Sequence, residues 1–160
     1  LHPTNRRQRQ MCIRDSIRIE SPDRLRNVIT TTAFLLENFD TNIIIQEVDK
    51  QSVFEKEALP ILEDIVEVDI WKNFNFIHKK SDEPLFHRQR VLNEMIMECE
   101  TDIVVNYDCD VILPKESYIL AYKGIMDNIY DVVYPYGQGM FQKQVAATDI
   151  TVSKLSLIHI

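Results

Sequence analysis

Cysteine is scarce in this sequence of 160 residues, and long apolar runs are absent. Three cysteines without a Cys-x-x-Cys pair are too few for the disulfide scaffold of a secreted protein and give no zinc motif. The longest apolar runs, such as Ile43 to Ile45, are far shorter than the ~20 residues that cross a bilayer. We therefore expect no transmembrane segment and a location in the cytoplasm, or peripherally at the inner face of the membrane.

Positive charge is also in short supply. Lysine and arginine number 18 against 25 aspartates and glutamates, which gives a net charge of −7, and the central region has no basic cluster. This balance argues against nucleic acid as a partner, because nucleic-acid binding depends on concentrated positive charge. It does not argue against a diphosphate, which an acidic protein can bind through a divalent cation and one or two arginines.

The two ends of the chain lack the periodicity of a helix or a strand. The strings Met-Cys-Ile-Arg-Asp-Ser near the start and Leu-Ser-Leu-Ile-His-Ile at the end resemble translated adapter sequence from assembled environmental reads. We expect residues 1–16 to be non-native or disordered and residues 154–160 to be a non-native tail. The alternative is a basic tail and a short final strand. The domain is then expected over residues 17–153, truncated at both ends.

Between these ends, strand and helix patterns alternate. Ile17 to Ile19 resembles the tail of a first strand, and Ser21-Pro22-Asp23 predicts the start of a helix, because it offers an N-cap, a proline for the first turn and a favourable acidic charge. Pro60 is expected to interrupt a helix that begins at Ser52. Residues 63–71 fit both the helix and the strand period. Further strands are predicted over residues 43–48, 74–78, 103–105 and 132–134, and further helices over residues 86–100 and after Pro114. This order predicts an α/β fold of three layers, α/β/α, around a mostly parallel sheet.

The stretch from Thr101 to Pro114 carries the chemistry. A buried strand over residues 103–105 runs into Asp108 and Asp110, and on extended backbone these two side chains point the same way while Cys109 points to the other face. In open α/β sheets, ligands bind at the carboxyl ends of the strands. Two aligned carboxylates at this edge suit a hard cation such as Mg²⁺ or Mn²⁺.

With these residues the chain resembles the nucleotide-diphospho-sugar transferases of the GT-A fold, most like family 2 glycosyltransferases and the galactosyltransferase-like branch. The resemblance covers most of residues 17–142. It rests on the segments Arg18-Ile-Glu-Ser-Pro22, Gln46-Glu-Val-Asp49, Phe86-His-Arg-Gln-Arg-Val-Leu-Asn93 and Asn106-Tyr-Asp-Cys-Asp110. It implies the transfer of a sugar from a nucleotide diphosphate sugar, a uridine diphosphate sugar in particular, to a glycan or polysaccharide acceptor.

The resemblance also implies roles for single residues. Asp108 would lie near the ribose and share the metal, and Asp110 would bind Mn²⁺ or Mg²⁺. Arg18 and Glu47, which end the first two predicted strands, would line the nucleotide pocket. Substrate-binding roles also fall to the helix before the Asp-x-Asp strand, on Arg88, whose place at a helix start favours phosphate, and on Asn93. No catalytic base can be named, and we expect it beyond this fragment.

Two other functions stay open. A phosphatase of the haloacid dehalogenase type would use Asp108 as nucleophile and Asp110 as acid or base, but its motif normally ends the first strand of the domain, whereas three predicted strands precede it here. A non-catalytic sugar-nucleotide-binding fragment is compatible with the missing base. A nucleotidyltransferase is disfavoured, because Glu20-Ser21-Pro22 is not a glycine-rich phosphate loop.

Overall fold

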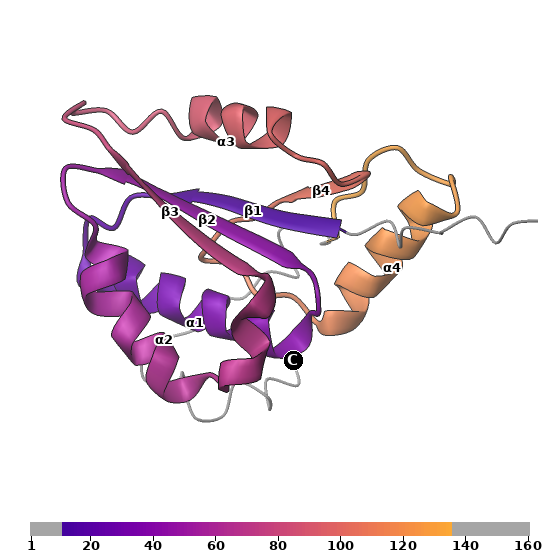
Figure 1. Ribbon diagram of the computed structural model, residues 1–160. Coiled ribbons are helices and arrows are strands. Elements are labelled where there is room, and N and C mark those ends of the chain that lie inside the picture. Colours follow the sequence, from indigo (N-terminus) through magenta and orange to yellow (C-terminus); the bar gives the residue numbers. More distant parts are fainter. Residues whose placement is uncertain (1–10, 136–160) are drawn as a thin grey trace, which may run out of the picture. The chain divides into compact units, whose positions relative to one another are not determined.

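A computed structural model describes residues 11–135 of the chain (Figure 1). The chain divides into two compact units, Leu1–Asp110 and Val111–Ile160. The described part of the second unit contains one helix, α4 (Lys115–Met126), which begins directly after Pro114, as predicted. The remainder of the fold belongs to the first unit.

The first unit is built on a parallel sheet. Its described part holds a four-stranded sheet in the order β3-β2-β1-β4, and every neighbouring pair is parallel. The strands are β1 (Met11–Ile17), β2 (Asn42–Asp49), β3 (Phe74–Lys80) and β4 (Ile103–Asn106). The helices are α1 (Pro22–Asn38), the π-helical turn η1 (Phe54–Ala58), α2 (Leu59–Ile65), the 3₁₀ helix η2 (Val68–Asn73) and α3 (Arg88–Met97).

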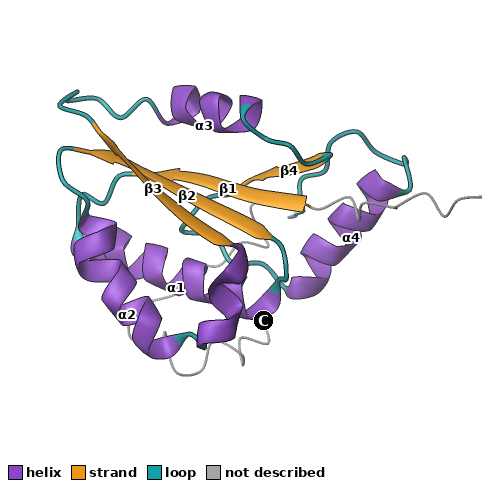
Figure 2. Ribbon diagram, in the orientation of Figure 1, coloured by secondary structure: helices purple, strands orange, loops and turns teal. Residues whose placement is uncertain are grey.

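Helices cover both faces of this sheet. Figure 2 shows α1 and α2 on one face and α3 on the other. The predicted α/β fold with three layers and a mostly parallel sheet is therefore confirmed. No helix within residues 11–135 combines the length and the apolar character that a membrane crossing needs.

Helix α1 illustrates how local sequence sets the elements. Ser21 caps the helix, its Oγ accepting a hydrogen bond from the Arg24 backbone N–H at 3.2 Å, and Pro22 occupies the first turn. One face of α1 then packs into the core with Val28, Ala33 and Leu36 all less than 5% exposed. Leu25, Val28, Ile29 and Leu36 recur at three- to four-residue intervals or multiples of them, a helical pattern that predicts this packing.

The largest difference from the sequence-based expectation lies at the start of the chain. Residues 11–16, which we expected to lack regular structure, form most of β1 at the centre of the sheet. Cys12 and Ile13 are buried apolar residues, but the next three, Arg14, Asp15 and Ser16, are polar and equally buried. Three consecutive buried polar residues obscure both the apolar run and the alternation by which a strand is identified. Residues 1–10 and 136–160, which include the predicted tail, lie outside the described residues.

Two further expectations were wrong in detail. Pro60 does not interrupt the helix after Ser52; instead η1 continues directly into α2, and Pro60 lies in the first turn of α2, where the missing backbone N–H costs little. Residues 132–134 do not form a strand, and Val132 is exposed. A run of three apolar residues is too short for its periodicity to separate a strand from a loop.

Candidate functional site

The sheet places a natural binding position between β1 and β4. β2 and β3 lie on one side of β1, and β4 lies on its other side, so the order in which the chain adds strands reverses between β1 and β4. In open parallel sheets, ligands bind at the carboxyl ends of the strands at such a reversal. Asp108 follows β4 at this edge, and α1 begins shortly after β1.

Arg88, the first residue of α3, joins the elements at this edge. Its Nη2 donates to the Tyr107 carbonyl oxygen at 2.6 Å and to Asp15 Oδ1 at 3.2 Å. The same nitrogen lies 3.7 Å from Asp108 Oδ1, and the side chain remains 38% exposed. The guanidinium is therefore anchored on one side by buried groups and accessible on the other, next to an exposed carboxylate.

Asp108 and Asp110 lie close to each other, but not along a strand. β4 ends at Asn106, and residues 109–110 form a turn, so the expected alternation on extended backbone is wrong. Both aspartates are exposed. Partial burial raises the pKa of Asp108, Arg88 opposes this change, and the charge of Asp110 and its hydrogen bond to Asp108 raise the pKa further. The two carboxyl groups therefore lie close enough to present neighbouring oxygens to a cation.

Cys109, between the two carboxylates, is held by its backbone. Thr31 Oγ1 donates to the Cys109 carbonyl oxygen at 3.0 Å, which ties the turn to α1. Burial, followed by the negative charges of Asp15, Asp108 and Asp110, raises the pKa of the Cys109 thiol to about 12. This thiol stays protonated at neutral pH, which disfavours Cys109 as a nucleophile.

Sequence reasoning missed two residues of this site. Asp15 is 3% exposed, and its Oδ2 is buried without a hydrogen-bond partner among the described residues. Burial raises its pKa to about 7, although Arg88 acts against this change. Arg24, in the first turn of α1, is a second positive charge that opposes the raised pKa of Asp108. No sequence signal marked Asp15, because it lies between the polar residues Arg14 and Ser16, within a segment that we expected to lie outside the domain.

The carboxylates alone do not form a complete metal site. Within residues 11–135, no three His, Cys, Asp or Glu side chains are grouped so that they could hold a metal ion. Mg²⁺ and Mn²⁺, however, commonly bind to one or two carboxylates together with substrate phosphate oxygens and water. Asp108 and Asp110 fit this second mode of binding, in which the ligand completes the coordination.

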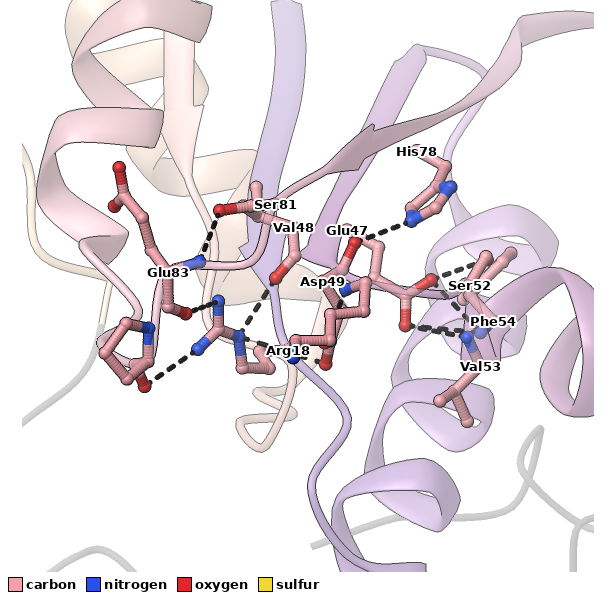
Figure 3. A network of polar contacts seen from close by, with 12 residues as sticks. Arg18, Glu47, Val48, Asp49, Ser52, Val53, Phe54, His78, Ser81 and Glu83 are labelled. Carbon is pink, nitrogen blue, oxygen red and sulfur yellow. Dashed lines mark hydrogen bonds and ion pairs between the residues drawn. The ribbon is translucent and has the colours of Figure 1, made fainter.

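Arg18 lies in a separate network at the carboxyl end of β2 (Figure 3). It is 7% exposed, and its Nε donates to the Val48 carbonyl oxygen at 3.0 Å. Its Nη1 and Nη2 donate to the carbonyl oxygens of Pro84 and Glu83, at 3.3 and 3.2 Å. The guanidinium also lies 5.4 Å from the centre of the Phe86 ring. Arg18 thus fastens the loop before α3 to β2, and its donors face protein carbonyls.

Glu47 lies in the same network and caps the turn that follows β2. The side chain is 0% exposed; its carboxylate accepts hydrogen bonds from the Ser52 hydroxyl at 2.6 Å and from the backbone N–H groups of Val53 and Phe54 at 3.1 and 3.2 Å. These N–H groups begin η1 and would otherwise lack partners. Figure 3 shows the Glu47 carboxylate turned toward these donors.

Asn93 is exposed on α3, and its Oδ1 accepts a hydrogen bond from Gln89 Nε2 at 3.2 Å on the same helix. The structure therefore brings together three of the six residues that we predicted, Arg88, Asp108 and Asp110. Arg18 and Glu47 form the second network.

The chain was also compared with known proteins. No protein-family model matches it, and no curated protein sequence gives a significant match. Its function must therefore be argued from the site itself.

At this site the partly exposed Arg88 guanidinium lies beside the exposed Asp108 carboxylate, and Asp110 follows in the same turn. Such an arrangement can bind a cation on the carboxylates and, beside it, an anion that contacts both the cation and a guanidinium. A ligand that carries several phosphate oxygens satisfies both requirements at once.

Proposed function

We propose that this chain is the nucleotide-sugar-binding part of a metal-dependent glycosyltransferase. The proposal is carried by one observation, the partly exposed Arg88 guanidinium 3.7 Å from Asp108 at the β1/β4 edge. It is supported by the parallel sheet, whose strand order reverses at this edge, and by the sequence resemblance to the GT-A fold. The donor is a nucleotide diphosphate sugar, a uridine diphosphate sugar in particular, and the acceptor is a glycan or a polysaccharide.

Each residue of the site has a defined part in this proposal. Asp110, with Asp108, provides the oxygens for Mn²⁺ or Mg²⁺, and Asp108 also lies near the ribose. A bound divalent cation would supply positive charge to the diphosphate that leaves the sugar. Arg88 contacts phosphate oxygens from the start of α3, where the backbone N–H groups also favour an anion. Asp15 and the Tyr107 carbonyl hold Arg88 in position.

The proposed role of this chain is to bind the sugar donor. It does not include the general base that takes the proton from the hydroxyl group of the acceptor sugar. No described side chain is assigned as the general base. The proposed location of the protein is the cytoplasm, or a peripheral position at the inner face of the membrane. Nucleic acid is not among the proposed partners, because the chain carries a net charge of −7.

Isothermal titration with uridine diphosphate, with and without Mn²⁺, tests this proposal. We expect binding only when the metal is present. Asp110→Asn should lose most of this binding, because an amide keeps the shape of the side chain and loses its charge, and Asp108→Asn should lose less. Asp64→Asn, an exposed aspartate on α2, is the matched control and should bind like the wild type. Metal-independent binding, or an Asp110→Asn variant equal to the wild type, would remove the support for the proposal.

A second experiment on the same chain separates the phosphatase alternative from the glycosyltransferase. Asp108 follows β4, the fourth strand along the described chain, whereas a haloacid dehalogenase would carry its nucleophile after the first strand. Beryllium fluoride, which mimics an aspartyl phosphate, should therefore leave Asp108 unmodified. A stable adduct on Asp108 would favour the phosphatase over the glycosyltransferase.

A further inference from the structure

A second feature of the first unit lies at the amino ends of the strands, away from the carboxyl edge. A cavity of about 340 Å³ is lined there by the first residues of β1 and β2 and by the connection between α3 and β4. Two of the three cysteines of the chain, Cys12 and Cys99, line this cavity together with Arg14 and Thr101. We refer to this space, lined by these four residues among others, as the thiol cavity.

Arg14 gives the thiol cavity a positive charge. Its side chain is 5% exposed, and its Nε donates to Cys12 Sγ at 3.3 Å. Arginine remains charged in proteins, so a buried guanidinium favours the thiolate form of a nearby cysteine. A positive charge beside two thiols is the environment in which cysteine becomes reactive.

Cys99 is the more reactive of the two thiols. It is partly exposed and lies after the end of α3, in the connection over residues 98–102. Its Sγ lies 2.9 Å from Thr101 Oγ1. Burial acts to raise the pKa of Cys99, but the hydrogen bonds with Thr101, the charge of Arg14 and the contact with Cys12 outweigh it, so that the pKa lies below its ordinary value. Cys99 therefore combines access with thiolate character.

Cys12 is less accessible than Cys99. It is 2% exposed, so an external reagent reaches it poorly. Burial raises the pKa of Cys12, Arg14 opposes this change, and Cys99 itself is among the groups that raise it. The two thiols therefore interact directly, and Cys12 remains a protonated thiol next to the reactive one.

We propose that Cys99 and Cys12 are an oxidation-sensitive pair, in which Cys99 reacts with hydrogen peroxide and Cys12 converts the product into a disulfide. The Cys99 thiolate attacks one oxygen of the peroxide; an S–O bond forms, the O–O bond breaks, and hydroxide leaves. The Cys12 sulfur then attacks the sulfenic acid; an S–S bond forms, the S–O bond breaks, and water leaves with the Cys12 proton. The two thiols lose two electrons and the peroxide gains them. A small dithiol reverses the reaction.

This site is independent of the proposed glycosyltransferase function. It also carries an internal control, because Cys109 does not line the thiol cavity. A reversible disulfide of this kind agrees with a reducing compartment, where disulfides are usually transient.

The first experiment needs only the full chain in its reduced form. After one equivalent of hydrogen peroxide at pH 7, we expect its intact mass to fall by about 2 Da, the two hydrogens lost, and dithiothreitol to restore it. Peptide mapping should find Cys12 and Cys99 in one cross-linked species. With limiting iodoacetamide, the partly exposed Cys99 should be labelled before the buried Cys12. An unchanged mass after excess peroxide, or Cys12 labelled first, would overturn the proposal.

Three variants separate the two steps. Cys12→Ser should stop at the sulfenic acid, with a gain of about 16 Da on Cys99 that dimedone traps. Cys99→Ser should neither lose 2 Da nor form this acid, and Cys109→Ser should behave like the wild type. A Cys99→Ser variant that still loses about 2 Da would refute the assignment. If Cys12→Ser does not fold, the peptide map and the labelling order of the wild-type chain decide the question.

Discussion

Removing the Glu47 carboxylate should destabilise the first unit, although the sequence resemblance implies that this residue binds substrate. The side chain is 0% exposed and accepts hydrogen bonds from two backbone N–H groups of the turn that starts η1. Hydrogen bonds to a charged group contribute about 1.5–3 kcal/mol each, and a donor left buried without a partner costs a similar amount. Glu47→Ala should therefore lower the free energy of unfolding by about 3–5 kcal/mol, counting only the two backbone donors.

Glu47→Gln gives a finer test of the same argument. The amide keeps one acceptor oxygen and turns an N–H₂ group toward donors, so we expect a loss of about 1.5–3 kcal/mol. Urea unfolding followed by circular dichroism measures both variants, and for an m-value of about 2 kcal/mol/M the midpoint of Glu47→Ala should fall by about 1.5–2.5 M. Glu63→Gln, an exposed carboxylate on α2, is the control and should leave the midpoint unchanged. If Glu47→Ala unfolds at the same urea concentration as the wild type but loses nucleotide binding, the capping role is wrong and Glu47 contacts the ligand instead.

Three more predictions concern the carboxyl edge. Burial raises the pKa of Asp15 to about 7, so the folded chain holds this proton up to about pH 7, whereas the unfolded chain releases it near pH 4. The free energy of unfolding should therefore fall as the pH rises from about 4 to about 7. In urea unfolding, Asp15→Asn should be more stable than the wild type at pH 8, by on the order of 2–4 kcal/mol, but not at pH 4. Arg88→Ala should weaken metal-dependent binding of uridine diphosphate by about 1.5–3 kcal/mol and leave uridine binding unchanged, as measured by titration calorimetry; equal losses for both ligands would contradict a phosphate contact. Arg18→Met should speed amide hydrogen exchange over residues 81–86, because the carbonyls of Glu83 and Pro84 lose their donors. The control Lys56→Met, at an exposed position on η1, should not; unchanged exchange in Arg18→Met would show that Arg18 does not hold this loop.

The elements that the sequence predicted well are those whose signals are local. The cap at Ser21, the apolar stripe of α1 and the apolar run of β2 each lie within a few residues, so short patterns identify them. The same holds for α3 and for Asp108 and Asp110, which lie two residues apart. The predicted α3 extended beyond the observed bounds, because helix ends depend on caps that periodicity does not show.

The parts that could not be predicted depend on partners far apart in the sequence. Arg18 donates to carbonyl oxygens on residues 48, 83 and 84, and no local pattern announces that these groups meet. The side chain of Asp15 is buried through its contact with Arg88, which lies 73 residues further along the chain. A polar residue in a strand usually indicates an exposed position, and only the tertiary structure shows that the Asp15 side chain is buried.

The central position of β1 has a consequence for how the protein is made. Met11 pairs with Ile103 and Arg14 pairs with Asn106, whereas β2 joins β1 and β3 within a much shorter stretch of chain. At a synthesis rate of about 5–20 residues per second, β3 leaves the ribosome about 1–5 seconds before β4, and β1 and β2 leave it earlier still. During this interval the edge of β1 that later binds β4 has open backbone hydrogen-bonding groups, and Asp15 lacks both Tyr107 and Asp108 as neighbours. The candidate site is therefore assembled last, and the nascent sheet depends on β4 to close the edge at which another chain could pair.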